Sequence, residues 1–269
     1  MVKKGNETPS GTIDHREKML DCNCNLNRDS SASKAIKTCS TSLLLQETGR
    51  SRRSQVYPLL FGSKEIPIFC HMRKFRCGGG EWTLTMKIDG TKRTFHYDSH
   101  FWSYRNSLDL LRAKTGFDLQ ETKLATYWNT YFSKVCLGIR IGHQNRFMII
   151  NRHANSLYSL IAVGKYHATS LGRYTWRRLI GPDASLQRNC DMEGFNAKVN
   201  TGNSKARIGI IANNDNDCNS CNSRIGFGTG LKHLIGFGTE GRNTCGNEAM
   251  YSPDNGEKHI RTMGYILVQ

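Results

Sequence analysis

The chain has 269 residues, of which 38% are hydrophobic, and its formal net charge is +16. A chain of this size can bury a hydrophobic core in one domain or two. The sequence contains no run of eighteen apolar residues, so it predicts no transmembrane helix. The positive charge predicts attraction to acidic polymers and surfaces. We expect no nucleic acid among the partners, because no reader motif is present and basic residues are not interleaved with aromatic ones along a strand.

The first part of the chain differs in composition from the rest. Residues 1–38 are rich in Asn, Ser, Lys and Asp and lack periodic apolar positions, which predicts a disordered polar tail. Its basic start is not followed by an apolar core, so it does not read as a secretory signal peptide. A folded domain is predicted over residues 39–269, and it begins with a short helix around residues 43–45 that ends before Gly49.

The stretch of residues 69–88 predicts two strands joined by a glycine turn. Apolar residues alternate on both sides of the three glycines at 78–80, namely Ile66, Ile68 and Cys70 before them and Trp82, Leu84, Met86 and Ile88 after them. This period of two is typical of a strand, and the glycines permit a sharp turn. We expect a hairpin, with a flexible linker as the alternative interpretation of the glycines.

The middle of the chain predicts further strands and short helices. Residues 135–141 and 146–150 read as paired strands across the polar turn 142–145. Short helices are expected over residues 156–163, where Ser156 is a candidate N-cap, and over residues 175–180.

Ten cysteines are present, at positions 22, 24, 39, 70, 77, 136, 190, 218, 221 and 245. Disulfides persist mainly in oxidising compartments, so this number favours a secreted, extracellular protein. A cytosolic protein with reduced or metal-bound thiols is the alternative.

Several short phrases of the sequence together point to one family. They are FCHM at 69–72, GGGEWT at 78–83, MKIDG at 86–90, TFHYDS at 94–99 and MGYILVQ at 263–269. Over about residues 39–269 the chain resembles the fibrinogen-related C-terminal domain, in the intelectin-like branch found in coral skeletal organic matrix proteins. It departs from the family pattern at His71, where Asp is usual, at the extra Cys77 and at the inserted Glu81.

The resemblance implies an α+β fold. We expect a single fibrinogen C-terminal-like domain with a central twisted antiparallel sheet, short helices, long C-terminal loops and stabilising disulfides. The family positions imply a bond between Cys39 and Cys70. Matching of cysteine-bearing segments suggests Cys136 with Cys190 and Cys218 with Cys245, and leaves four cysteines unassigned: Cys22, Cys24, Cys77 and Cys221.

A polar loop is the candidate metal site. It follows the apolar strand 207–211 and contains the candidate ligands Asn213, Asp215, Asn216 and Asp217. Glu248, further along the chain, is a fifth candidate ligand. Carboxylate and amide oxygens on a flexible loop suit calcium, and the phrase resembles part of the acidic calcium loop of fibrinogen-related domains. A solvated polar turn is one alternative. Another is a zinc site, with ligands drawn from Cys218, Cys221, Cys245 and either His233 or His259.

The same C-terminal region holds the candidate ligand contacts. Fibrinogen-related domains recognise sugars or acetylated groups beside their calcium loop, and the resemblance extends that role here to Phe227, Phe237, Asn247 and Tyr251. The phrase IGFGT occurs twice, at 225–229 and 235–239, which lengthens this loop.

The sequence favours binding over catalysis, because it contains no nucleophile elbow, no HExxH and no convincing pair of acid/base carboxylates. We expect a non-catalytic, extracellular, calcium-dependent recognition protein for carbohydrate or acetylated groups. The alternative is a structural or adhesive matrix protein that binds acidic or sulfated polysaccharides by charge. The basic clusters at 50–53 and 173–178 would serve that role, unless they are ordinary solvated surface. Either function is compatible with a homo-oligomer.

Overall fold

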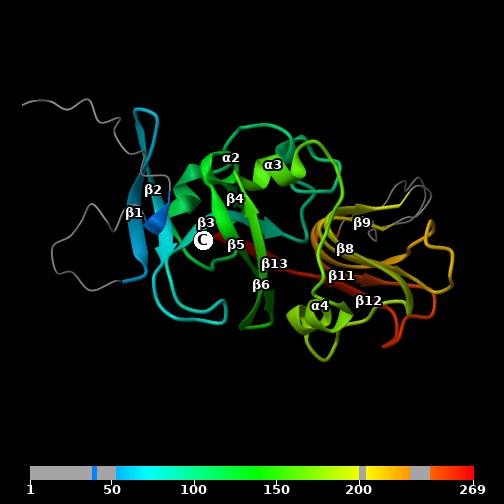
Figure 1. Ribbon diagram of the computed structural model, residues 1–269. Coiled ribbons are helices and arrows are strands. Elements are labelled where there is room, and N and C mark those ends of the chain that lie inside the picture. The colour runs from blue at the N-terminus through cyan, green and yellow to red at the C-terminus, as the bar shows by residue number, and fades with distance from the viewer. Residues whose placement is uncertain (1–37, 41–52, 200–203, 231–242) are drawn as a thin grey trace, which may run out of the picture. The chain divides into compact units, whose positions relative to one another are not determined.

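The computed structural model describes residues 38–40, 53–199, 204–230 and 243–269 (Figure 1). These belong to one unit spanning residues 35–269. The predicted tail, except Thr38, and the predicted helix at residues 43–45 lie outside the described residues. No helix of the described part is long and apolar enough to cross a membrane.

Seven strands form the first sheet. Its order is β1-β2-β3-β13-β5-β6, with β4 beside β3, and all of its pairs are antiparallel. The bounds are β1 Gln55–Phe61, β2 Lys64–His71, β3 Trp82–Asp89, β4 Thr122–Lys123, β5 Phe132–Ile141, β6 Gln144–Ala154 and β13 Met263–Val268. The predicted strand pairs on either side of residues 78–80 and of residues 142–145 are both confirmed.

Six strands form a second antiparallel sheet in the order β12-β11-β10-β9-β8-β7. The bounds are β7 His167–Ala168, β8 Asn189–Lys198, β9 Lys205–Asn213, β10 Ser223–Gly230, β11 Cys245–Ala249 and β12 Lys258–Arg261. The prediction of one central sheet followed by long C-terminal loops is therefore wrong in part. Residues 226–241 were expected in a glycine-rich loop, but the described ones among them, 226–230, belong to strand β10 between β9 and β11.

Glycines make this second sheet possible. Gly194, Gly209, Gly226 and Gly246 lie opposite one another on β8, β9, β10 and β11. At Gly226 the backbone has φ +154°, and an added Cβ would lie 2.3 Å from the carbonyl oxygen of Ile208. Only glycine combines that backbone conformation with so close an approach of the neighbouring strand.

Short helices connect the strands. They are the 3-10 helices η1 His100–Trp102 and η2 Leu110–Lys114, and the α-helices α2 Thr126–Asn129, α3 Leu157–Ile161 and α4 Arg173–Ile180. Ser156 caps α3 as expected, because its hydroxyl accepts a hydrogen bond from the N–H of Ser159 at 3.1 Å.

The main hydrophobic core joins the two sheets. It contains Ile266 of β13, Ile208 of β9 and Trp176 of α4 in one cluster of buried side chains. A second cluster, including Trp82 and Tyr265, covers the first sheet.

Three disulfides lie among the described residues. Cys39 is bonded to Cys70, as expected. The predicted pairs of Cys136 with Cys190 and of Cys218 with Cys245 are wrong. Cys77 pairs with Cys136 and Cys190 pairs with Cys218, while Cys221 and Cys245 are buried thiols.

The strand positions explain the corrected pairing. Cys77 and Cys136 share one buried cluster against the first sheet. Cys190 is the second residue of β8 and follows Asn189, which pairs with Asn213 at the end of β9, so Cys190 meets Cys218 in the loop after β9. Cys245 instead faces Phe227 inside the second sheet. Because Cys218 is bonded, it cannot supply a thiolate to the zinc site considered above.

Candidate anion-binding cleft

The polar loop after β9 is folded on itself. Asn213 is buried, and its Nδ2 donates hydrogen bonds to Oδ1 of Asp215 and to the carbonyl oxygen of Asp217, both at 2.7 Å. The same Oδ1 accepts the N–H of Asp217 at 2.9 Å. Asp215, Asn216 and Asp217 are exposed. Within the described ranges, no group of three or more His, Cys, Asp and Glu side chains is placed to hold a metal ion.

Glu248 lies apart from that loop. It is fully buried on β11, opposite Arg224 of β10. Its carboxylate contacts Nδ1 of His259 and accepts a hydrogen bond from Asn243 at 3.4 Å. The structure therefore leaves Glu248 in a separate buried group, and of the other four expected ligands Asn213 is buried while Asp215, Asn216 and Asp217 are exposed.

The expected ligand contacts do not form one surface. Phe227 is fully buried in the core between the sheets, because its alternation with Ile225 places both on the inner face of β10. Asn247 is also fully buried and donates to the carbonyl oxygens of Ser185 at 2.8 Å and Arg224 at 3.0 Å. Tyr251 is exposed. Phe237 lies outside the described residues.

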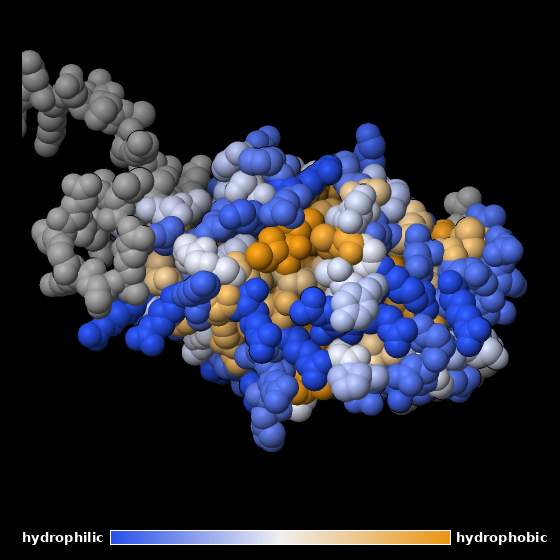
Figure 2. Space-filling model, turned by 60° about the horizontal axis from the view of Figure 1, so that its bottom comes forward, coloured by the Kyte–Doolittle hydropathy of each residue, from blue (hydrophilic) through white to orange (hydrophobic). Residues whose placement is uncertain are grey.

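A basic cleft lies on the described part of the chain. It has a volume of about 1270 Å³ and lies between α4 with its following turn, the β5–β6 hairpin and the segment between β2 and β3. Figure 1 shows α4 beside the end of this hairpin, at the lower edge of the view. The face of the molecule brought forward in Figure 2 is largely hydrophilic, with apolar residues exposed in a hollow near its centre. Five arginines line the cleft: Arg76, Arg146, Arg173, Arg177 and Arg178.

Glu193 of β8 holds the start of α4. Its Oε1 accepts the N–H of Gly172 at 2.9 Å, and its Oε2 accepts the N–H of Leu171 at 3.2 Å and Nε1 of Trp176 at 2.6 Å. A carboxylate at a helix N-terminus satisfies N–H groups that have no partner within the helix. The buried ring of Trp176 then fixes which face of α4 points to solvent.

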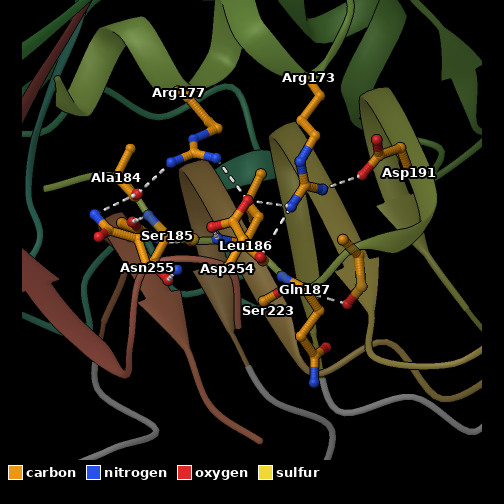
Figure 3. A network of polar contacts seen from close by, with 12 residues as sticks. Arg173, Arg177, Ala184, Ser185, Leu186, Gln187, Asp191, Ser223, Asp254 and Asn255 are labelled. Atoms are coloured by element: carbon orange, nitrogen blue, oxygen red, sulfur yellow. Dashed lines mark hydrogen bonds and ion pairs between the residues drawn. The ribbon is translucent and has the colours of Figure 1, made fainter. Parts of the chain in front are cut away.

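Two of the cleft arginines are bound to carboxylates (Figure 3). Arg173 contacts Asp191 at 2.7 Å and Asp254 at 2.8 Å, and Arg177 contacts the same oxygen of Asp254 at 2.5 Å. Both guanidinium groups also donate to backbone carbonyls, Arg173 to Leu186 and Arg177 to Ala184. These two arginines therefore tie α4 to the chain that leads into β8.

The other three have no such partner. Among the described residues, Arg76, Arg146 and Arg178 make no ion pair with a carboxylate. Arg178 is exposed, and its guanidinium carbon lies 5.8 Å from the ring centroid of Tyr174, a side chain 74% exposed. Three unneutralised guanidinium groups in one concave site make it attractive to anions.

The sequence indicated one part of this cleft. The basic cluster at 173–178 was recognised, but two of its arginines prove to be structural. Arg76 and Arg146 escaped notice because they lie far from residues 173–178 in the sequence and meet α4 only in the fold. Of the other basic cluster, only Arg53 lies within the described residues.

Searches of protein-family models and of curated proteins found no match to this chain. The assignment of a function therefore depends on the chemistry of the site itself.

Proposed function

We propose that this protein is a non-catalytic, extracellular binding protein that holds acidic polymers, such as sulfated or carboxylated polysaccharides, in the cleft beside α4. The observation that carries the proposal is the meeting of Arg76, Arg146 and Arg178 in one cleft without a carboxylate partner in the part of the chain that the structure describes. The guanidinium fork matches the geometry of sulfate and carboxylate groups. The net charge of +16 adds a long-range attraction for the same ligands.

An extracellular location is part of this proposal. Three disulfides among the described residues support it, because such bonds persist mainly in oxidising compartments. The fibrinogen-like relationship suggested by the sequence is proposed with it. It is supported by the antiparallel sheets, the short helices and the Cys39–Cys70 bond at the expected family position.

Calcium-dependent recognition of carbohydrate or acetylated groups is the second proposal. It is supported by the exposed Asp215 and Asp217 on a loop that also presents Asn216. Such a site would take ligands from the loop without Glu248, with backbone carbonyls completing the coordination.

Binding to immobilised heparin tests the first proposal. A variant with Arg76→Ala, Arg146→Ala and Arg178→Ala should elute at lower salt than the wild type, with an affinity at least about tenfold weaker, since hydrogen bonds to charged groups contribute roughly 1.5–3 kcal/mol each before exposure reduces them.

The matched control removes three charges elsewhere, through Lys64→Ala, Arg93→Ala and Arg188→Ala, at residues that are all exposed. Equal weakening by both variants would leave only a diffuse charge effect. Elution of the wild type at the salt concentration of a neutral protein would remove the proposal. Calcium chelation should leave the binding unchanged.

A further inference from the structure

The five arginines of the cleft form two groups that differ in their contacts. Arg173 and Arg177 are less than one-third exposed and have their donors directed at Asp191, Asp254 and backbone carbonyls. Arg76, Arg146 and Arg178 come from three different segments and form no ion pair with a carboxylate of the described residues.

The guanidinium of Arg146 is positioned by a glycine of the turn after α4. It lies directly on Gly181, where an added Cβ would come within 1.4 Å of Nη1. Gly181 has φ +96°, a conformation that side-chain-bearing residues rarely adopt. The turn after α4 thus leaves an open surface on which the planar guanidinium of Arg146 lies, and this positions Arg146 at the cleft wall, where no carboxylate of the described ranges pairs with it.

The remaining lining adds two further requirements on a ligand. Tyr174 presents a ring that is 74% exposed, which suits the apolar face of a sugar ring or another flat group. Gln144 is exposed and brings a side-chain amide to the same cleft, and this amide can both donate a hydrogen bond to a ligand hydroxyl and accept one from it.

We propose that the cleft is a discrete site for a sulfated saccharide, in which the forks of Arg76, Arg146 and Arg178 each take a sulfate or carboxylate group, Tyr174 packs on a sugar ring and the side-chain amide of Gln144 bonds a hydroxyl. This inference rests on the proposed function and makes it specific. A diffuse positive field requires charge alone, whereas this site requires guanidinium geometry and a ligand with rings and hydroxyls.

Conversion of the three residues to lysine separates charge from geometry. The variant with Arg76→Lys, Arg146→Lys and Arg178→Lys keeps the net charge, and its affinity for a size-defined heparin oligosaccharide, measured by calorimetry, should fall at least fivefold. The control, Arg93→Lys with Arg188→Lys, should bind as the wild type does. Unchanged binding by the triple lysine variant, together with weak binding by the triple alanine variant, would overturn the discrete site and leave the charge-based proposed function standing. No binding of heparin by the wild type would overturn both.

Ligand class is tested with a panel at equal charge concentration. Heparin oligosaccharide should bind at least tenfold more tightly than inorganic polyphosphate and poly-glutamate, and Tyr174→Ala should weaken heparin binding about threefold to tenfold without changing polyphosphate binding. Equal affinity for all three polymers, or a preference for poly-glutamate, would contradict the saccharide assignment. Thermal unfolding of each variant verifies that it is folded.

Discussion

Asp254 is the carboxylate that binds both Arg173 and Arg177 of α4. Its Oδ2 accepts from Arg173 at 2.8 Å and from Arg177 at 2.5 Å, and its Oδ1 accepts the N–H of Leu186 at 3.1 Å. The side chain is only 16% exposed. Asp254→Asn keeps the shape of this residue and removes its charge, so it leaves two largely buried guanidinium groups with a weaker acceptor.

The expected loss of stability follows from these contacts. Hydrogen bonds to charged groups contribute roughly 1.5–3 kcal/mol each, and an amide oxygen replaces part of that, so we expect a loss of about 2 kcal/mol. For a domain of this size the melting temperature should fall by about 4–8 °C. Differential scanning calorimetry measures this shift. Asp183→Asn is the matched control, because Asp183 is exposed and has the same charge.

Binding to heparin should change in the opposite direction. Asp254 neutralises two arginines that line the cleft, so Asp254→Asn should raise the salt concentration needed for elution, and by more than Asp183→Asn does. An unchanged melting temperature would refute the structural role of the Asp254 contacts. Earlier elution than the wild type would refute the claim that its charge opposes anion binding.

Three further perturbations test other parts of the structure. Replacement of Cys77 and Cys136 by serine opens a loop with a sequence separation of 59 residues and should lower the free energy of unfolding by about 4 kcal/mol. Denaturant titration measures this change, and a loss below about 1 kcal/mol would contradict the prediction. Burial lowers the pKa of Lys123 from 10.5 to about 8. The unfolded chain therefore binds this proton more tightly, and the free energy of unfolding should rise between pH 8 and pH 10.5 by at most about 1.4 kcal/mol per pH unit. A pH series in which Lys123→Met shows the same rise would exclude this residue as the cause. If the second proposal holds, calcium titration should release or absorb heat that Asp215→Asn with Asp217→Asn abolishes, and a wild type without any calcium heat would end that proposal.

Local patterns were the part of the fold that sequence could predict. Alternating apolar residues around Gly78 and a polar turn before Arg146 correctly indicated strand pairs, and Ser156 correctly marked the start of a helix. Each of these depends on neighbours along the chain, where the periods of strands and helices are visible.

The second sheet was hidden by its glycines. Gly226 and Gly228 interrupt the apolar positions of β10, so the strand reads as a loop although Ile225 and Phe227 alternate with them toward the core. The same interruption made Phe227 look like a surface aromatic available to a ligand. Glycine here serves the close approach of strands and not flexibility.

Long-range pairings could not be derived from spacing. Cys136 meets Cys77 because both lie against the first sheet, and Cys190 meets Cys218 because β8 and β9 are neighbours. The cleft is a further case, since strands β3, β4 and β5 separate Arg76 from Arg146 in the sequence and only the fold joins the two residues.

Arginine footprinting with phenylglyoxal tests most directly whether Arg76, Arg146 and Arg178 bind the acidic ligand. The full chain is modified with and without a heparin oligosaccharide, and the modified peptides are quantified by mass spectrometry. The ligand should protect Arg76, Arg146 and Arg178, while the exposed Arg93 and Arg188 react as before. Equal protection of all five arginines, or protection that spares the three in the cleft, would contradict the assignment of the cleft as the binding site.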